Sequence, residues 1–353
     1  MADTREFLLG QCARRPGLRP EDLLKGLHQS VFGCGHFVSA DSRDRLLREL
    51  AALPAGGDDP GIEALDGPFC RVHLAHLAAC GLSAETLHRL FVLSGETVSG
   101  SPEELEEKLT VLRALAAEGL LPFSRKETEE AVDRWRQKGF PACHHSREVT
   151  ERYAPHYRVI RRDFGRAIPL LSAMDGLLAA KGGGIVAIDG GSAAGKTTLA
   201  AWLERIYDCQ VFHMDDFFLR PHQRTPQRLA EPGGNVDRER FREEVLEPVR
   251  RGETVQLRRY DCHTGLLSSP EEQPPKALTV VEGAYSMHPE LAGFYDLTAF
   301  LAISPEEQRR RIALRNDPES RQLFFDRWIP LEQRYFMAAD VPGRCGLVLQ
   351  AEP

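Results

Sequence analysis

Hydrophobic and polar positions follow two different patterns along this chain. Up to about residue 165, apolar residues recur three and four positions apart, as at Leu105, Leu109 and Leu112, which is typical of amphipathic helices. Capping serines precede two of these runs and glycines follow them. The pattern predicts helices over residues 20–32, 42–53, 83–93, 101–119 and 124–139. No convincing strand appears, so residues 1–165 are predicted to form an all-helical N-terminal domain of unknown role.

The pattern changes after the glycine-rich residues 181–184. Short apolar or β-branched runs now alternate with helical patterns such as 238–251 and 305–316. The apolar runs are residues 185–189, 211–214, 278–281, 297–303 and 347–349. This alternation predicts an α/β domain over residues 180–353, with a mostly parallel sheet of about five strands flanked by helices.

Length and composition support this division and narrow the class of partner. A chain of 353 residues exceeds one typical domain, and a net charge of -7 argues against a nucleic-acid or anionic-lipid partner. No apolar stretch reaches about 18 residues, and the eight cysteines form no C-x-x-C pair. We therefore expect a cytoplasmic protein with free thiols and a small polar substrate.

A phosphate-binding motif follows the first predicted strand of the second domain. Residues 190–197 match G-x-x-x-x-G-K-[ST], the Walker A or P-loop pattern, and a helical run follows. Backbone N–H groups of such a turn, at a helix N-terminus, surround a polyphosphate. Lys196 is expected to reach the terminal phosphates of ATP and Thr197 to ligate Mg²⁺. The predicted ATP-binding residues are Gly190, Gly191, Ser192, Ala193, Ala194, Gly195, Lys196, Thr197 and Thr198.

Two carboxylates follow the second predicted strand of this domain. The segment H-M-D-D-F-F at 213–218 places Asp215 and Asp216 beside the expected phosphate site, and no N-K-x-D guanine motif occurs. A kinase needs such a group to orient and deprotonate an acceptor hydroxyl. The other interpretation of the pair is a solvated strand end or a helix cap.

These motifs resemble the uridine kinase and phosphoribulokinase superfamily, which includes nicotinamide riboside kinases, over roughly residues 185–350. The resemblance implies that Asp215 is the catalytic base. It places Asp216 and Phe217 near the substrate, with the Mg²⁺ shell as a second position for Asp216. The acidic residue that ends the third strand, Glu282, is similar to a family element that organises magnesium together with Thr197.

The arginine-rich run at 309–316 resembles the family helix that enters a mobile lid, here expected near residues 309–327. By this resemblance Arg311 and Arg315, with Arg321 as a third candidate, stabilise charge on the transferring phosphoryl group.

Two segments on the acceptor side are ambiguous. Residues 233–237 resemble an acceptor-side loop, although Asp237 could simply cap the next helix. Residues 259–264 resemble the segment around the base in uridine kinases, but a cysteine replaces an aromatic residue and the histidine follows the aspartate by two positions instead of four. Tyr260 and His263 therefore either line the acceptor pocket or pack a hairpin, and pyrimidine specificity does not carry over.

The expected activity is ATP-dependent phosphoryl transfer, with Mg²⁺, to a hydroxyl of a small molecule, and a nucleoside is implied by the resemblance. The alternatives are a pantothenate-, glycerate- or sugar-like alcohol, or a nucleotide-sensing regulatory ATPase. Kinases of this superfamily are often homo-oligomers, and no residue here tests that.

An unusual stretch in the first domain combines histidine, cysteine and two glycines at residues 28–36. A helix end or a substrate-contacting loop explains it, and a metal site would need further ligands, for example from residues 143–145. Tyr153, His156 and Tyr157 either reach the kinase cleft or pack between domains.

Overall fold

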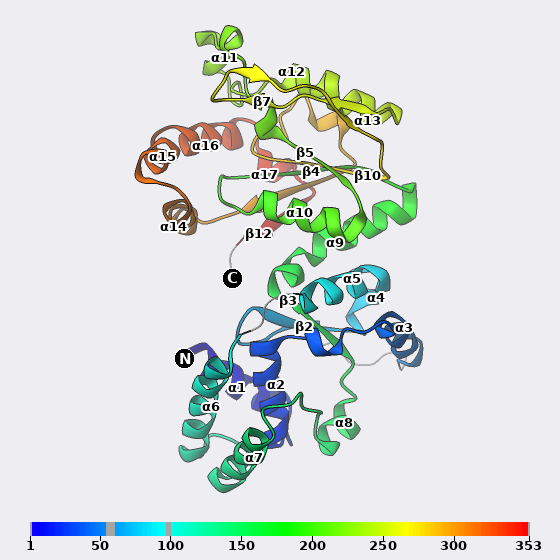
Figure 1. The fold of residues 1–353 in the computed structure, drawn as a ribbon, viewed down its shortest axis with the longest axis vertical. Helices are drawn as coiled ribbons and strands as arrows, with labels where there is room; N and C mark the ends of the chain where they lie inside the picture. Colours follow the sequence, from blue (N-terminus) through cyan, green and yellow to red (C-terminus); the bar gives the residue numbers. More distant parts are fainter. Residues whose placement is uncertain (1, 54–60, 97–99, 352–353) are drawn as a thin grey trace. The chain divides into compact units, whose positions relative to one another are not determined.

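A computed structural model describes residues 2–53, 61–96 and 100–351 of the chain (Figure 1). The chain divides into two compact units, Met1–Ser172 and Ala173–Pro353. The division falls inside helix α9 (Arg162–Lys181), so one helix belongs to both units. The sequence-based boundaries, residues 165 and 180, both lie within this helix. Among the described helices, none is both long and apolar enough to cross a membrane, and all eight cysteines are free thiols.

The first unit is rich in helices, as its sequence pattern predicts. Ser101 and Ser124 accept hydrogen bonds from the backbone N–H groups of Glu104 and Glu127, so both expected caps are present. The helices are α1 (Ala2–Arg14), α2 (Pro20–Phe32), η1 (Gly35–Phe37), α3 (Ser42–Ala52), α4 (His76–Cys80), α5 (Ala84–Gly95), α6 (Pro102–Ala117), α7 (Arg125–Gln137) and α8 (Arg147–Tyr153).

The first unit also contains a sheet, which corrects the prediction that it is all-helical. Strands β1 (Ile62–Ala64), β2 (Phe69–His73) and β3 (Tyr157–Arg161) form an antiparallel sheet in the order β1-β2-β3. All of β2 is buried, and its Arg71 pairs with Glu63 of β1 at 3.2 Å. The strand therefore lacks the alternation of buried and exposed positions found in strands with one face in water.

The second unit has the parallel five-stranded sheet that its sequence predicts. The strands are β4 (Gly184–Gly190), β5 (Gln210–His213), β10 (Leu278–Glu282), β11 (Leu297–Ala302) and β12 (Leu347–Gln350), and their order is β12-β11-β4-β10-β5. Because β4 lies between β10 and β11, the loop after β4 leaves the carboxyl edge at the centre of the sheet. Ligands of open α/β sheets bind at this edge.

Helices and small hairpins surround this sheet. Its helices are α10 (Lys196–Tyr207), α11 (Pro226–Ala230), α12 (Arg238–Phe241), α13 (Glu247–Arg251), α14 (Pro305–Arg315), α15 (Pro318–Leu323), α16 (Ile329–Ala338) and α17 (Val341–Arg344), with short turns η2 (Met214–Phe217), η3 (Pro221–Gln223), η4 (Arg242–Leu246), η5 (Ala292–Phe294) and η6 (Phe324–Trp328). Strands β6 (Val255–Leu257) and β9 (Glu271–Gln273) pair, as do β7 (Tyr260–Asp261) and β8 (Leu266–Leu267). Helices α14, α15 and α16 form an arc beside the sheet (Figure 1).

Candidate active site

The turn between β4 and α10 requires glycine at both ends. A Cβ atom on Gly190 would lie 2.5 Å from the Leu301 carbonyl oxygen of the neighbouring strand β11. Gly195, at φ +98°, takes the left-handed conformation from which α10 begins. The two glycines thus let the backbone fold tightly at the centre of the sheet edge.

The Lys196 side chain folds back over this turn. Its Nζ donates hydrogen bonds to the carbonyl oxygens of Gly190 at 2.8 Å and Gly191 at 2.9 Å, and the side chain is buried. The first turn of α10 leaves the N–H groups of residues 196–198 without intrahelical partners. Together with the helix dipole, these N–H groups and the ammonium make the loop a suitable site for phosphate groups.

Two oxygen ligands lie where a magnesium ion would bind beside the loop. The Thr197 hydroxyl donates to Glu282 Oε1 at 3.0 Å, and Glu282 is the last residue of β10. A hydroxyl and a carboxylate suit Mg²⁺, which also keeps waters and phosphate oxygens in its shell. Within the described residues, no three His, Cys, Asp or Glu side chains form a metal site. The donor set therefore fits a magnesium ion that is bound mainly through a nucleotide.

A histidine that the sequence analysis missed binds the same carboxylate. His213, the last residue of β5, lies opposite Glu282 in the parallel register, and its Nδ1 is 2.5 Å from Glu282 Oε1. This hydrogen bond raises the pKa of His213. The signal in the sequence was its position at a strand end, immediately before the acidic pair.

Asp215 and Asp216 follow His213 in the turn η2. Asp215 presents surface to solvent, but many protein atoms surround its carboxyl group. This loss of hydration raises its pKa, nearby Glu282 raises it further, and Lys196 opposes the rise. Asp216 lies 3.4 Å from the Arg259 guanidinium. The structure thus brings Asp215, Lys196 and Glu282 into one electrostatic environment.

Asp189 is a buried aspartate that holds the loop by hydrogen bonds, and the sequence analysis missed it too. Asp189 accepts hydrogen bonds from the N–H groups of Gly190 at 2.7 Å and Met287 at 2.9 Å, and from the Tyr335 hydroxyl at 2.8 Å. Burial raises its pKa to about 6. The signal for Asp189 in the sequence was a charged residue at the end of the otherwise apolar run 185–189.

Glu332 of α16 also contacts the loop, at Ser192. Its carboxylate accepts hydrogen bonds from the Ser192 N–H at 2.9 Å and the Ser192 hydroxyl at 2.5 Å. Burial raises the pKa of Glu332, and Lys196 lowers it. No local pattern could reveal this contact, since 140 residues separate the partners.

The expected lid arginines have different environments. Arg311 Nη1 donates to the loop carbonyl of Ala193 at 3.3 Å. Arg315 is exposed and lies over the ring of Phe324, and Arg321 donates to Ala313 at 3.2 Å. Of the three, the structure brings only Arg311 to the loop.

Phe217 lies in the core, which differs from the expectation that it lies near the substrate. It is fully buried and packs edge-on against Phe241, with ring centroids 4.8 Å apart. The cause is η2, whose turn at the end of β5 directs Phe217 into the core.

The two ambiguous segments lie outside the loop and have different surroundings. Tyr260 lies in the hairpin strand β7, where its hydroxyl accepts a hydrogen bond from Arg224 at 3.0 Å, and His263 lies exposed in the turn that follows. Asp237 caps α12 by accepting a hydrogen bond from the Arg240 N–H.

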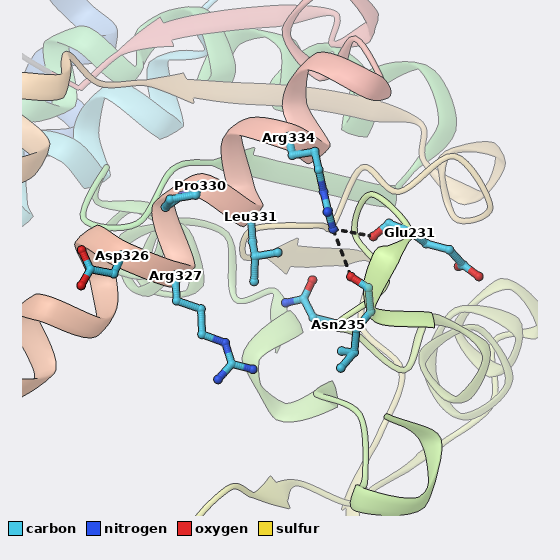
Figure 2. A pocket seen from close by; sticks show the side chains of 8 residues that line it. Glu231, Asn235, Asp326, Arg327, Pro330, Leu331 and Arg334 are labelled. Atoms are coloured by element: carbon cyan, nitrogen blue, oxygen red, sulfur yellow. Dashed lines mark hydrogen bonds between the residues drawn. The ribbon is translucent and has the colours of Figure 1, made fainter. Parts of the chain in front are cut away.

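A cavity of about 430 Å³ lies between the 229–235 segment and the helical turns η6 and α16 (Figure 2). Arg327, Leu331 and Asn235 point toward one another across it. The Arg334 guanidinium closes one side by donating to the carbonyls of Leu229 at 3.1 Å and of residue 231 at 3.2 Å. The Asn235 side chain lies within hydrogen-bond reach of the Tyr285 side chain. Two arginines and two acidic residues line the cavity, so it offers charges of both signs to a polar molecule.

No family model and no curated protein matches this chain. Among solved structures, it is similar to a "possible uridine kinase" from Bacillus stearothermophilus, with 22% identity and a TM-score of 0.37, over 50% of this chain and 94% of that one. A structure assigned as a fructose transport system kinase, from Silicibacter sp. TM1040, has 20% identity and a TM-score of 0.40. The match covers 47% of this chain and 89% of that one. D-glycerate 3-kinase from Cryptococcus neoformans has 16% identity and a TM-score of 0.33, and the match covers 44% of this chain and 80% of that one. With TM-scores this low, the fold assignment rests on the strand order and the loop themselves.

Proposed function

We propose that this protein transfers the γ-phosphoryl group of ATP, with Mg²⁺, to a hydroxyl of a small molecule. One observation carries the proposal: Lys196, Thr197, Glu282 and Asp215 meet at the carboxyl ends of three neighbouring strands. Binding of MgATP needs only the first three groups, because Glu282 serves the magnesium ion. The additional carboxylate, Asp215, suits a site that also activates an acceptor.

The loop and its neighbours hold the nucleotide in this proposal. The N–H groups at the start of α10 and the Lys196 ammonium bind the phosphates, and Thr197 with Glu282 holds Mg²⁺. When bound, MgATP supplies the phosphoryl group and much of the positive charge that phosphoryl transfer requires. Arg311, which already contacts the loop, adds positive charge on the lid side. Arg315 would join it only if the lid moves.

Asp215 accepts the proton of the acceptor hydroxyl. A general base works best when its pKa approaches the operating pH, and the surroundings of Asp215 raise its pKa in that direction. Lys196 keeps the ionised form accessible, because a nearby positive charge favours it.

The cavity beside the lid is the proposed acceptor site (Figure 2). Arg327 and Asn235 offer hydrogen-bond donors to hydroxyl, carbonyl or carboxylate groups. A nucleoside is the first acceptor class to test, through the resemblance to uridine kinases. Pantothenate-, glycerate- and sugar-like alcohols present the same kinds of acceptor groups. Asp216, Tyr260 and His263 remain proposed contacts of a larger acceptor.

The test is ADP release by the full chain with MgATP and pools of nucleosides, sugars and small hydroxy acids. We expect acceptor-dependent release with one pool, and a loss of about 10²–10⁴-fold in Asp215→Asn. Asp208→Asn is the matched control, because Asp208 is exposed and pairs with Lys276 away from the loop. Its release should equal that of the wild type.

Two outcomes would contradict the proposal. If ATP binds and no acceptor from any pool is consumed, the domain is better described as a nucleotide-sensing regulator. If Asp215→Asn keeps full acceptor-dependent release, the carboxylate is not the base.

A further inference from the structure

A second cavity, of about 290 Å³, lies wholly within the first unit. Helices α2, α3 and α5 and strand β3 form its walls, together with the segment around His145. These are the segments whose histidines, cysteines and tyrosines had no clear role in the sequence. The proposed phosphoryl transfer uses none of its residues.

Lys25 of α2 is a buried cation at this cavity. Its Nζ donates a hydrogen bond to the Cys143 carbonyl oxygen at 2.9 Å, and the residue is 9% exposed. No carboxylate among the described residues lies within ion-pair distance of it. The nearest acid, Asp22, accepts hydrogen bonds from His145 and from the N–H of Ser146.

The surroundings of Lys25 penalise its charge. Burial lowers its pKa to about 8, and the neighbouring Arg71 adds to the effect. An ammonium group in such a place costs free energy unless an anion pairs with it. An anion inside the cavity would remove that cost.

The other charges that line the cavity do not supply such an anion. Glu49 is the only acidic side chain in the described lining, and it pairs with Arg158 at 2.9 Å. Arg45 of α3 also lines the cavity; it donates to the Phe37 carbonyl at 2.9 Å and pairs at 3.5 Å with Asp41, which is not part of the lining. The lining itself thus carries three cations and one carboxylate, and of the three cations Lys25 is the one without an ion-pair partner among the described residues.

Aromatic side chains form the rest of the wall. Phe37 and Phe91 line the cavity together with Tyr157, whose hydroxyl lies 2.8 Å from His145 Nε2. His145 Nδ1 in turn lies 3.2 Å from Asp22, so the tyrosine is held in place by a buried chain of polar groups. A cavity that combines apolar walls with polar groups fixed in place can hold a small molecule.

We propose that this cavity binds a small organic anion, a carboxylate or a phosphate monoester with a flat apolar part. The anionic group of this ligand pairs with Lys25 and lies near Arg45. Its apolar part packs against Phe37, Phe91 and Tyr157. The first unit is then a ligand-binding unit with a site of its own, separate from the nucleotide site.

Isothermal titration of the full chain at pH 7 with benzoate, phenyl phosphate and neutral benzyl alcohol tests this. We expect at least one anion to bind with a Kd of about 1 mM or lower, at least tenfold tighter than benzyl alcohol. The anion that binds identifies the group as carboxylate or phosphate. If neither anion binds more tightly than the alcohol, the proposal is wrong.

Variants locate the binding. Lys25→Met should weaken the anion at least tenfold, and Lys196→Ala should leave it unchanged, which excludes the P-loop as the site. Arg45→Met should weaken it by about twofold to fivefold, as expected for a partly exposed charge. Arg43→Met is its control on α3, because Arg43 pairs with Glu85 and does not line the cavity. If Lys25→Met does not fold, the α3 variants decide. Equal affinity of Arg45→Met and Arg43→Met for the anion would then refute the proposal.

Discussion

The second unit places its charged groups at the ends of its strands, whereas the first unit buries them inside its sheet. Asp189 and Glu282 are also buried, but together with His213 they lie at or next to the ends of parallel strands, beside the loop that follows β4. Arg71 and Glu63 instead pair in the middle of antiparallel strands, 1% and 8% exposed. We expect the charges at the strand ends to serve the proposed chemistry and the charges within the strands to serve the structure. The following predictions test that contrast.

The largest expected effect is the loss of ATP turnover in Lys196→Ala. Removing one charged group that is aimed at the transferring phosphates costs on the order of 10²–10³-fold in rate. Circular dichroism should show an intact fold. Lys181→Ala is the control, since Lys181 is exposed and pairs with Asp296 at 3.0 Å. Turnover that persists in Lys196→Ala would remove the P-loop from the mechanism.

The effect of Arg71→Met on stability should be of similar size. Removing one partner of a buried pair leaves Glu63 with fewer positive neighbours and should cost about 3–5 kcal/mol. Hydrogen exchange at the amides of β2 measures this loss within the first unit. Arg5→Met, which breaks an exposed pair with Glu118, should cost about 1 kcal/mol or less. Equal costs in the two variants would show that the buried network does not hold the sheet.

Glu332→Gln should have a smaller effect, on nucleotide binding. The Glu332 carboxylate accepts a hydrogen bond from the Ser192 N–H and lies near Lys196. At this position its negative charge repels the phosphates of ATP. Removing this charge should lower the KM for MgATP by about threefold to tenfold, or about 1 kcal/mol. Glu306→Gln, an exposed change on α14, is the control. A higher KM in Glu332→Gln would mean that the carboxylate holds the loop in its binding conformation.

The smallest effect concerns pH. Asp215 must be ionised to accept a proton, and its pKa is raised, so kcat/KM should fall as the pH falls through this raised value. The acidic limb should therefore lie above about 3.9, the ordinary pKa of aspartate. A pH–rate profile measures it, and Asp215→Asn should remove the limb from the residual rate. An unchanged limb in that variant would assign it to another group.

The sequence predicted the parts of the site that depend on neighbouring residues. The P-loop follows from a strand, a glycine turn and a helix in immediate succession. Asp215 and Glu282 were expected from their positions after predicted strands together with the resemblance to the uridine kinase superfamily. The error at Phe217 arose one turn later, because η2 rotates this side chain into the core.

The parts that the sequence did not predict depend on long-range contacts. Tyr335 meets Asp189 across 146 residues, and no local periodicity records such a pairing. The sheet of the first unit was missed for a related reason. Buried Arg71 resembles a surface residue until its partner Glu63 is known.

The most direct test of the proposed activity is ³¹P NMR of MgATP with the full chain and the pool of acceptors that releases ADP. The account predicts that the γ-phosphate signal of ATP disappears while an equal signal of a new phosphate ester grows, and that Asp215→Asn does neither at the same enzyme concentration. ADP accompanied by inorganic phosphate alone, with no phosphate ester, would contradict a kinase and indicate an ATPase.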